Sequence, residues 1–236
     1  FAMTMFRVWY AQPGSTVPQT LRKHSLESRL LDLLPAAQRT SEEFNKMCEA
    51  TGGLGELIEL QAKQAVVNAK RLLRQQIVDQ VELETGDDEI IAAAKATAAQ
   101  YSLNEAECLV LVWDALMHTA ELNKKSDMQQ DQAMRLVHTH LKLFAAFSEA
   151  AKSQVALMVA MQNFCYEHQG LLKAYPKLIL LLYKGDVLEE DAIFNWYDKS
   201  HSSKGKTVFL QSMQELVDWL KNAEEEEEDD DDDDDE

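Results

Sequence analysis

The hydrophobic positions of the chain recur with the period of an α-helix, about 3.6 residues, rather than with the alternation of a β-strand. Residues 102–122 give the clearest case, where one apolar face comprises Cys108, Val112, Leu116 and Ala120, widened by Leu109, Trp113 and Met117. Comparable patterns predict helices at about residues 18–35, 40–52, 54–83, 128–149, 153–168, 176–183, 187–199 and 206–223, and an alanine-rich helix after Gly86. No segment convincingly predicts a strand.

Local signals place the ends of several of these helices. Three pairs have the spacing of a capping box, in which an N-terminal side chain and an acid three residues later satisfy free backbone N–H groups: Thr40 with Glu43, Ser102 with Glu105, and Asp186 with Glu189. Gly52 and Gly53 predict a helix end, and the long helix at 54–83 is expected to kink or break once. The result is an all-α protein of about ten helices, either stacked helical hairpins of the HEAT type or a compact bundle.

Charge is concentrated at one end of the chain. The formal net charge is −18, but Glu224–Glu236 is an unbroken run of 13 acids, and the remaining 28 acids are nearly balanced by 23 bases. Such a run cannot bury apolar surface, so we expect a disordered interaction tail. Its sign excludes nucleic acid as the partner of this end, because phosphate binding requires cations.

Several kinds of chemistry lack the residues that they require. The three cysteines are far apart, and His138 and His140 point to different sides of their helix, so neither a disulfide framework nor a metal site is expected. Gly205-Lys206-Thr207 lacks the earlier glycine of a phosphate-binding loop. We therefore predict no catalytic residue, metal or cofactor. No apolar stretch is long enough to span a bilayer, and a reduced, cytoplasmic setting is expected.

Two acidic-aromatic segments near the C-terminus are the candidate partner-binding site. The first carries Asp186, Glu189, Glu190, Asp191, Trp196 and Tyr197, and the second carries Asp218, Trp219, Glu224, Glu225 and Glu226. Lysine suits both, because its ammonium group pairs with carboxylates while its aliphatic stem covers aromatic surface. The alternatives are that the acids cap helices and that Trp196 and Trp219 pack in the core. Neither alternative explains acids at the C-terminal end of the second helix, where the helix dipole disfavours them.

A second patch, of opposite sign, is predicted on the helix at 54–83. Lys63, Lys70, Arg71 and Arg74 fall on overlapping faces of that helix. The alternative is an ordinary solvated helix face. If the four cations form a patch, it would bind an acidic partner.

Spaced motifs in the C-terminal half resemble a known family. Tyr175-Pro-Lys, Leu182–Asp191, Trp196-Tyr197, Lys204–Leu210 and Val217–Glu225 look like the two-tryptophan domain shared by translation initiation factor 5 and the epsilon subunit of the initiation factor 2 exchange factor. Lys204–Leu210, Glu121–Lys125 and Leu21–Leu31 further resemble the initiation factor 5-mimic proteins, also called the basic leucine zipper and two-tryptophan domain family. The resemblance covers nearly the whole chain.

This resemblance implies a HEAT-like fold, in which residues 1–100 form an upstream helical segment continuous with a core at 101–223, followed by the acidic tail at 224–236. It also implies a non-catalytic regulator that binds lysine-rich segments of the initiation factor 2 beta subunit, and initiation factor 3, through the two segments. Such a protein would compete with factor 5, repress initiation and tighten start-codon selection. Two other functions remain open: a nucleotide-exchange catalyst like the epsilon subunit, and a generic acidic chaperone for basic proteins.

Overall fold

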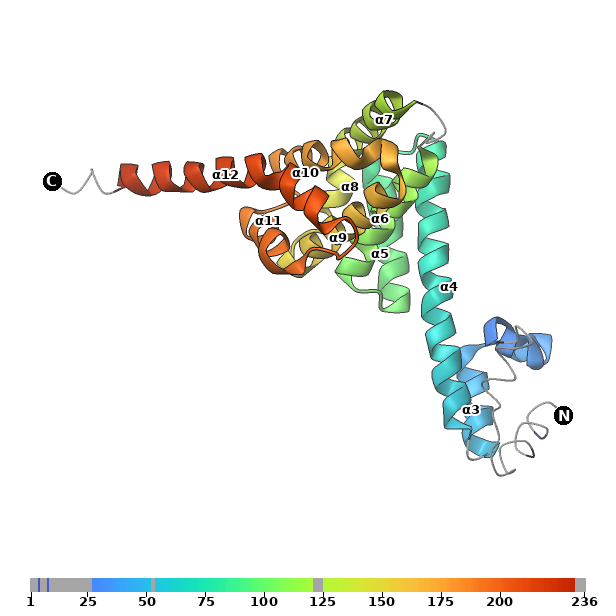
Figure 1. The fold of residues 1–236 in the computed structure, drawn as a ribbon. Helices are drawn as coiled ribbons and strands as arrows, with labels where there is room; N and C mark the ends of the chain where they lie inside the picture. Colours follow the sequence, from blue (N-terminus) through green and yellow to red (C-terminus); the bar gives the residue numbers. More distant parts are fainter. Residues whose placement is uncertain (1–3, 5–7, 9–26, 52–53, 121–124, 232–236) are drawn as a thin grey trace. The chain divides into compact units, whose positions relative to one another are not determined.

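The computed structural model describes residues 4, 8, 27–51, 54–120 and 125–231, and the structural statements below concern these residues. They form helices and connecting turns without a strand among them, which confirms the all-α class (Figure 1). The chain divides into two compact units, Phe1–Ala69 and Lys70–Glu236. The boundary expected after residue 100 lies inside the second unit, because α5 (Asp87–Tyr101) packs against α8 (Leu141–Ala145).

The first unit is built on a small apolar core. It contains the 3₁₀ turns η1 (Glu27–Leu33) and η2 (Ala36–Gln38), helix α3 (Ser41–Thr51) and the start of α4 (Gly55–Glu82). Its buried side chains are Leu30, Leu34, Phe44, Cys48, Leu54 and Leu57. The backbone N–H of Glu43 donates to Thr40 Oγ1 at 3.2 Å, which is one of the two hydrogen bonds of the predicted capping box. The expected helix start at Pro18 and the expected helix end at Gly52–Gly53 lie outside the described residues.

Helix α4 differs from the prediction because it runs for 28 residues as one helix. A kink or break was expected, but between Gly55 and Glu82 the helix contains no proline and no internal glycine. Most of its residues are strong helix formers. The sequence of this segment therefore favours one continuous helix.

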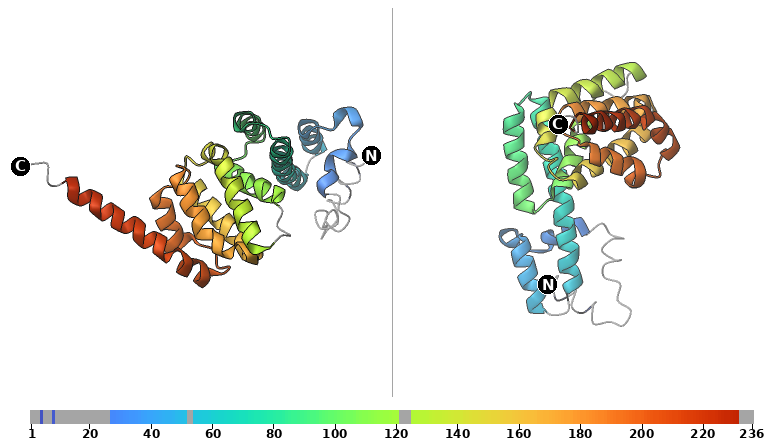
Figure 2. Two further views of the ribbon diagram at one scale, coloured as in Figure 1. Left: turned by 90° about the horizontal axis from the view of Figure 1, so that it is seen from above. Right: turned by 90° about the vertical axis from the view of Figure 1, so that its left-hand side faces the viewer.

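The second unit is a HEAT-like stack of helices. After the end of α4 it contains α5, α6 (Glu105–Thr119), α7 (Ser126–Thr139), α8, α9 (Ala151–Glu167), the 3₁₀ turn η3 (Gln169–Ala174), α10 (Tyr175–Lys184), α11 (Glu190–Asn195), the π-helical turn η4 (Trp196–Ser200) and α12 (Lys206–Asp231). Helix α9 packs against α6, α10 and α11. Figure 2 shows helices of this unit stacked side by side in chain order.

Aromatic side chains join the later helices in the core of the second unit. The ring of Tyr175 lies 5.3 Å from that of Trp196 and 4.9 Å from that of Phe209, measured between centroids. The Tyr175 hydroxyl donates to the carbonyl of Met158 at 3.2 Å, and complete burial raises the pKa of this phenol well above its usual value. Since these rings come from α10, η4 and α12, burying them fixes the three elements together.

Two predicted helix boundaries were wrong for identifiable reasons. The capping box of α6 uses Asn104 and Glu107, whereas Ser102 is in the left-handed conformation that closes α5. The helix expected at 128–149 is interrupted at His140, whose buried side chain has its Nδ1 2.7 Å from Asp87 Oδ1. At Asn104 and at His140 a polar side chain begins or interrupts a helix. The apolar pattern continues through both positions and therefore does not reveal these boundaries.

Helix α12 is longer than expected. It was predicted to end at Ala223, but the helix continues to Asp231, through the first part of the acidic run, and Figure 1 shows this end projecting beyond the other helices of its unit. Glutamate is a good helix former, so propensity favours continuation even though like charges in successive turns oppose it. No helix among the described residues is long and apolar enough to cross a membrane.

Candidate interaction surface

The acids of the first segment begin in the turn that ends α10. Asp186 has φ +55°, and its backbone N–H donates to Tyr183 O at 3.1 Å while that of Val187 donates to Leu182 O at 3.0 Å. This pair of bonds is a Schellman motif, in which the residue after the C-cap adopts the left-handed conformation. Asp186 is therefore a helix-end residue and not the N-cap of α11. The predicted capping box with Glu189 was wrong, because α10 extends to Lys184.

A buried glutamine positions the next acid. Glu189 is the N-cap residue of α11, and its backbone N–H donates to Gln154 Oε1 at 2.8 Å. The Nε2 of Gln154 donates in turn to Ser148 O at 2.9 Å, and the side chain is 1 % exposed. Helix α9 thus holds the Glu189 backbone, and the Glu189 side chain is exposed.

The two predicted tryptophans have opposite environments. Trp196 is fully buried, against Tyr175 and near His201, whose ring centroid lies 6.2 Å away. Trp219 is 48 % exposed. The prediction that Trp196 contacts a partner was therefore wrong, because its ring belongs to the aromatic core, whereas Trp219 is available on the surface.

Tyr183 joins the two segments into one surface. Its hydroxyl donates to Glu190 Oε1, and its ring packs edge-on against Trp219 with 6.3 Å between centroids. Glu190 belongs to the first segment and Trp219 to the second. The two predicted segments thus meet around Tyr183, which was not among the predicted site residues.

A second connection runs through Gln214. The half-buried Tyr197 donates its hydroxyl to Gln214 Oε1 at 2.5 Å, and Gln214 Nε2 donates to Asp218 Oδ1 at 2.8 Å. The Lys221 ammonium lies 5.8 Å from the centroid of the Phe194 ring, a cation–π contact between α12 and α11. These contacts hold the exposed Asp218 beside the first segment. Glu224, Glu225 and Glu226 follow on the same helix, with side chains outside the described part.

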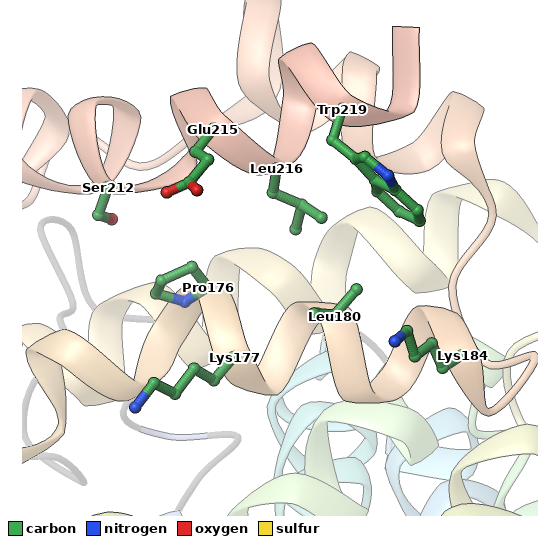
Figure 3. A pocket seen from close by; sticks show the side chains of 8 residues that line it. All are labelled: Pro176, Lys177, Leu180, Lys184, Ser212, Glu215, Leu216 and Trp219. Atoms are coloured by element: carbon green, nitrogen blue, oxygen red, sulfur yellow. The ribbon is translucent and has the colours of Figure 1, made fainter. Parts of the chain in front are cut away.

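Two adjoining depressions mark this surface. The first, here called the acidic pocket, has a volume of about 500 Å³ and is lined by Tyr183, Lys184, Asp186, Leu188, Glu189 and Glu190. The second, here called the α10–α12 groove, has a volume of about 600 Å³ and is lined by Pro176, Lys177, Leu180, Lys184, Ser212, Glu215, Leu216 and Trp219 (Figure 3). Lys184 borders both. Asp191 is exposed in the first turn of α11 and follows the pocket residue Glu190 in the sequence.

The predicted basic patch is not a set of free cations. Lys70 Nζ lies 2.7 Å from Glu107 Oε1, and Arg74 is paired with Asp114. The hydrogen bond from Lys70 lowers the pKa of Glu107. The other two residues, Lys63 and Arg71, are exposed, and Lys63 belongs to the first unit. Two of the four cations therefore bind α4 to α6, which contradicts a patch made of all four.

The possible metal ligands and the three cysteines are the groups that could form a reactive site. Among the described residues, no group of three His, Cys, Asp or Glu side chains could hold a metal ion. Burial raises the pKa of the Cys48 and Cys108 thiols to about 11 and that of Cys165 to about 12, so they are protonated at neutral pH.

Hydrogen bonds to α9 fix the loop that precedes Gly205-Lys206-Thr207. Gln162 Nε2 donates to Ser202 O at 3.0 Å and to Lys204 O at 2.9 Å, while Ser202 N–H donates to Gln162 Oε1 at 2.8 Å. A side chain in place of Gly205, which has φ +62°, would clash with Tyr166 and Phe209. The glycine is thus needed for chain reversal before α12.

Comparisons with known proteins agree with these two units. Residues 1–71 match the 5MP1/2 HEAT domain family, and residues 153–230 match the W2 family, described as eIF4-gamma/eIF5/eIF2-epsilon. Similar proteins include protein krasavietz of Drosophila melanogaster, with 37 % identity over 226 residues, 95 % of this chain and 53 % of that protein. Others are eIF5-mimic protein 2-B of Danio rerio and eIF5-mimic protein 2 of Homo sapiens, with 35 % and 34 % identity over 95 % of this chain and 54 % of theirs.

The fold and these matches define the class of protein: an all-helical HEAT-type protein that carries a W2 domain in its second unit. More narrowly, the chain is similar over 95 % of its length to proteins named eIF5-mimic proteins. It spans about half the length of the curated relatives that it matches. The suspected family resemblance is thereby confirmed.

Proposed function

We propose that this chain is a non-catalytic regulator of translation initiation that mimics initiation factor 5. Its acidic-aromatic surface binds lysine-rich segments of the initiation factor 2 beta subunit, and the chain also contacts initiation factor 3. By occupying these partners in the cytoplasm it competes with factor 5, represses initiation and tightens start-codon selection. The names of its relatives and the W2 match support the role in initiation.

The observation that carries the proposal is the meeting of the two segments around Tyr183. Asp186, Glu189 and Glu190 line one pocket together with Tyr183, and Trp219 packs edge-on against the Tyr183 ring. A lysine side chain can place its ammonium group among these carboxylates and its stem against the exposed aromatic surface. Exposed ion pairs contribute only about 0–1 kcal/mol each, so several acids must act together.

The acidic end of α12 has a different role in this proposal. A dense exposed charge raises the rate of encounter with a basic partner and makes binding depend on salt, but it selects poorly among basic partners. Selectivity is then expected from the acidic pocket and its aromatic border. The tail attracts the partner, and the pocket distinguishes it.

A binding experiment tests the assignment. A fluorescently labelled lysine-rich beta-subunit peptide is titrated into the intact chain and into a variant carrying Asp186→Asn, Glu189→Gln and Asp191→Asn. Asparagine tolerates the positive φ at position 186, so the first substitution removes charge with little change to the turn. We expect binding to weaken about tenfold, from three exposed ion pairs.

A matched control removes the same charge from other elements. Asp127→Asn, Asp131→Asn and Glu149→Gln affect exposed acids on α7 and after α8, and should leave the affinity nearly unchanged. A deletion ending at Ala223 should mainly lower the association rate. If the deletion abolishes binding while the pocket variant binds normally, the chain is an acidic chaperone and the pocket has no role.

The nucleotide-exchange alternative has its own readout. The W2 family description includes eIF2-epsilon as well as eIF5, so the fold is compatible with both roles. Release of labelled GDP from initiation factor 2 should not accelerate when the chain is added. Acceleration would contradict the non-catalytic assignment, whatever the peptide affinity.

A further inference from the structure

Helices α10 and α12 each carry a second apolar stripe beside the one that is fully buried in the core. On α10 the buried positions are Leu178, Ile179 and Leu182, whereas Pro176 and Leu180, four residues apart, are half-buried on another face. On α12 the buried positions are Phe209, Met213, Val217 and Leu220, whereas the half-buried Leu216, which also packs against the core, and the exposed Trp219 border the groove. These second stripes face each other across the α10–α12 groove (Figure 3).

The charges along the groove differ between its two walls. The α10 wall carries Lys177 and Lys184, both exposed, and the α12 wall carries the exposed Glu215. Within the described part of the chain, neither lysine has an ion-pair partner, in contrast to Lys70 and Lys204, which pair with Glu107 and Glu167. A lysine-rich segment would be repelled by the α10 wall. The groove therefore suits a ligand different from that of the acidic pocket.

The dimensions of the groove match a helix. Positions 176–184 span about 12 Å along α10 at about 1.5 Å per residue. A helix presents three apolar side chains, at i, i+4 and i+7, over that length, enough to reach Pro176, Leu180 with Leu216, and Trp219. An extended segment covers the same length in about four residues and directs only two side chains to one side.

We infer that the α10–α12 groove binds an amphipathic helix of a partner protein, with an apolar stripe on the groove floor and acidic residues along the flank that faces Lys177 and Lys184. The helix packs between α10 and α12 as one further helix of the stack. Trp219 is its anchor at one end, since exposed tryptophan at the edge of an apolar groove is a frequent centre of binding energy. The groove adjoins the acidic pocket and shares Lys184 and Trp219 with the proposed lysine-binding site, but its apolar floor and the lysines of its α10 wall suit a different ligand, so the inference does not depend on the proposed function.

The test uses the full chain and a designed probe. The probe is a fluorescent, alanine-based helical peptide of about 15 residues, with leucines at i, i+4 and i+7 and glutamates on one flank. One comparison peptide has lysines in place of the glutamates, and another has a central proline that breaks the helix. We expect the acidic probe to bind at least about tenfold more tightly than either comparison peptide, because the charges and the helical spacing both contribute.

Reversing the charge of the α10 wall tests whether its two lysines select an acidic helix. The double variant Lys177→Glu, Lys184→Glu changes exposed side chains, should fold normally, and should reverse the preference so that the lysine-flanked peptide binds better. Trp219→Ala should weaken the acidic probe about tenfold. The acidic-pocket variant with Asp186→Asn, Glu189→Gln and Asp191→Asn should bind the probe normally, which separates this inference from the proposed function.

Three results would overturn the inference. Equal binding of the acidic and lysine-flanked peptides would show that the wall does not select charge. Equal binding of the proline-containing peptide would show that the groove takes an extended segment. Sedimentation showing self-association that Trp219→Ala abolishes would identify a second copy of the chain as the occupant.

Discussion

Trp196 and Trp219 stand in similar local sequences, each after acids on an apolar helix face, yet one is buried and the other is half exposed. The difference arises from what each helix packs against. The Trp196 segment lies against α9 and touches Tyr175 from α10, whereas Trp219 lies where α12 passes α10 and borders the groove. Similar motifs in one domain can therefore have different functions: Trp196 stabilises the fold, and Trp219 is available for binding.

Truncating Trp196 should give the largest effect. Trp196→Ala leaves a cavity beside Tyr175 and should lower the free energy of unfolding by about 3–5 kcal/mol, measured by urea denaturation followed by circular dichroism. Trp196→Phe should cost less, because it keeps an aromatic ring and removes a buried indole N–H that has no partner among the described residues. A small effect of Trp196→Ala would mean that this segment is not part of the core, and the distinction between a structural Trp196 and an available Trp219 would not hold.

Removing Gln162 should give the next largest effect, and it tests the connection between the two segments. Gln162→Leu leaves the carbonyls of Ser202 and Lys204 and the Ser202 N–H without this partner, at a cost of about 1–3 kcal/mol. Hydrogen exchange at the start of α12 should increase more than exchange in α6. Uniform acceleration in both helices would argue against a local role for this glutamine.

A smaller change should follow from removing the Tyr183 hydroxyl. Tyr183→Phe keeps the ring against Trp219 but frees Glu190, and we expect lysine-peptide affinity to fall by about 0.5–1.5 kcal/mol, the value of one hydrogen bond. Because this hydrogen bond lies within the chain, the free energy of unfolding should also fall, by no more than about 0.5–1.5 kcal/mol. A large loss of stability with unchanged affinity would place this hydrogen bond in the fold and outside the binding surface.

Truncating Trp219 should have the smallest effect on stability. Trp219→Ala should change the free energy of unfolding by no more than about 0.5 kcal/mol, because the side chain is half in solvent. The same urea titration as for Trp196→Ala measures it, so the two tryptophans are compared directly. A loss as large as that for Trp196→Ala would show that both rings are structural.

The periodicity of the chain predicted the helices well because apolar spacing reports the face that each helix buries. It could not predict which of several helices covers a given face, and for this reason Trp196 was misassigned. The break at His140 and the turn at Asp186 depend on contacts with α5 and on the Schellman motif of α10, which no short-range pattern records. The pairing of Lys70 with Glu107 joins helices that are distant in sequence, so the apparent basic patch could not be tested from α4 alone.

The candidate site was only partly predictable. The carboxylates were found because acids beside aromatics are uncommon in a helical core. Tyr183 and Gln154 were missed because each lies in an apolar helix where a polar group gives no signal of its own. The only sequence clue to Gln154 is an amide on the face of α9 that also carries Met158 and Met161, where an apolar residue would be expected.

The continuation of α12 through Asp231 changes the physical character of the acidic run. A helix rises about 1.5 Å per residue, so Glu224–Asp231 carries one formal negative charge per about 1.5 Å of its axis. Double-stranded DNA carries one per about 1.7 Å and condenses counterions as a result. This end of the helix is therefore a short polyanionic rod, and a basic ligand that binds it gains free energy from released counterions, to an extent set by salt concentration.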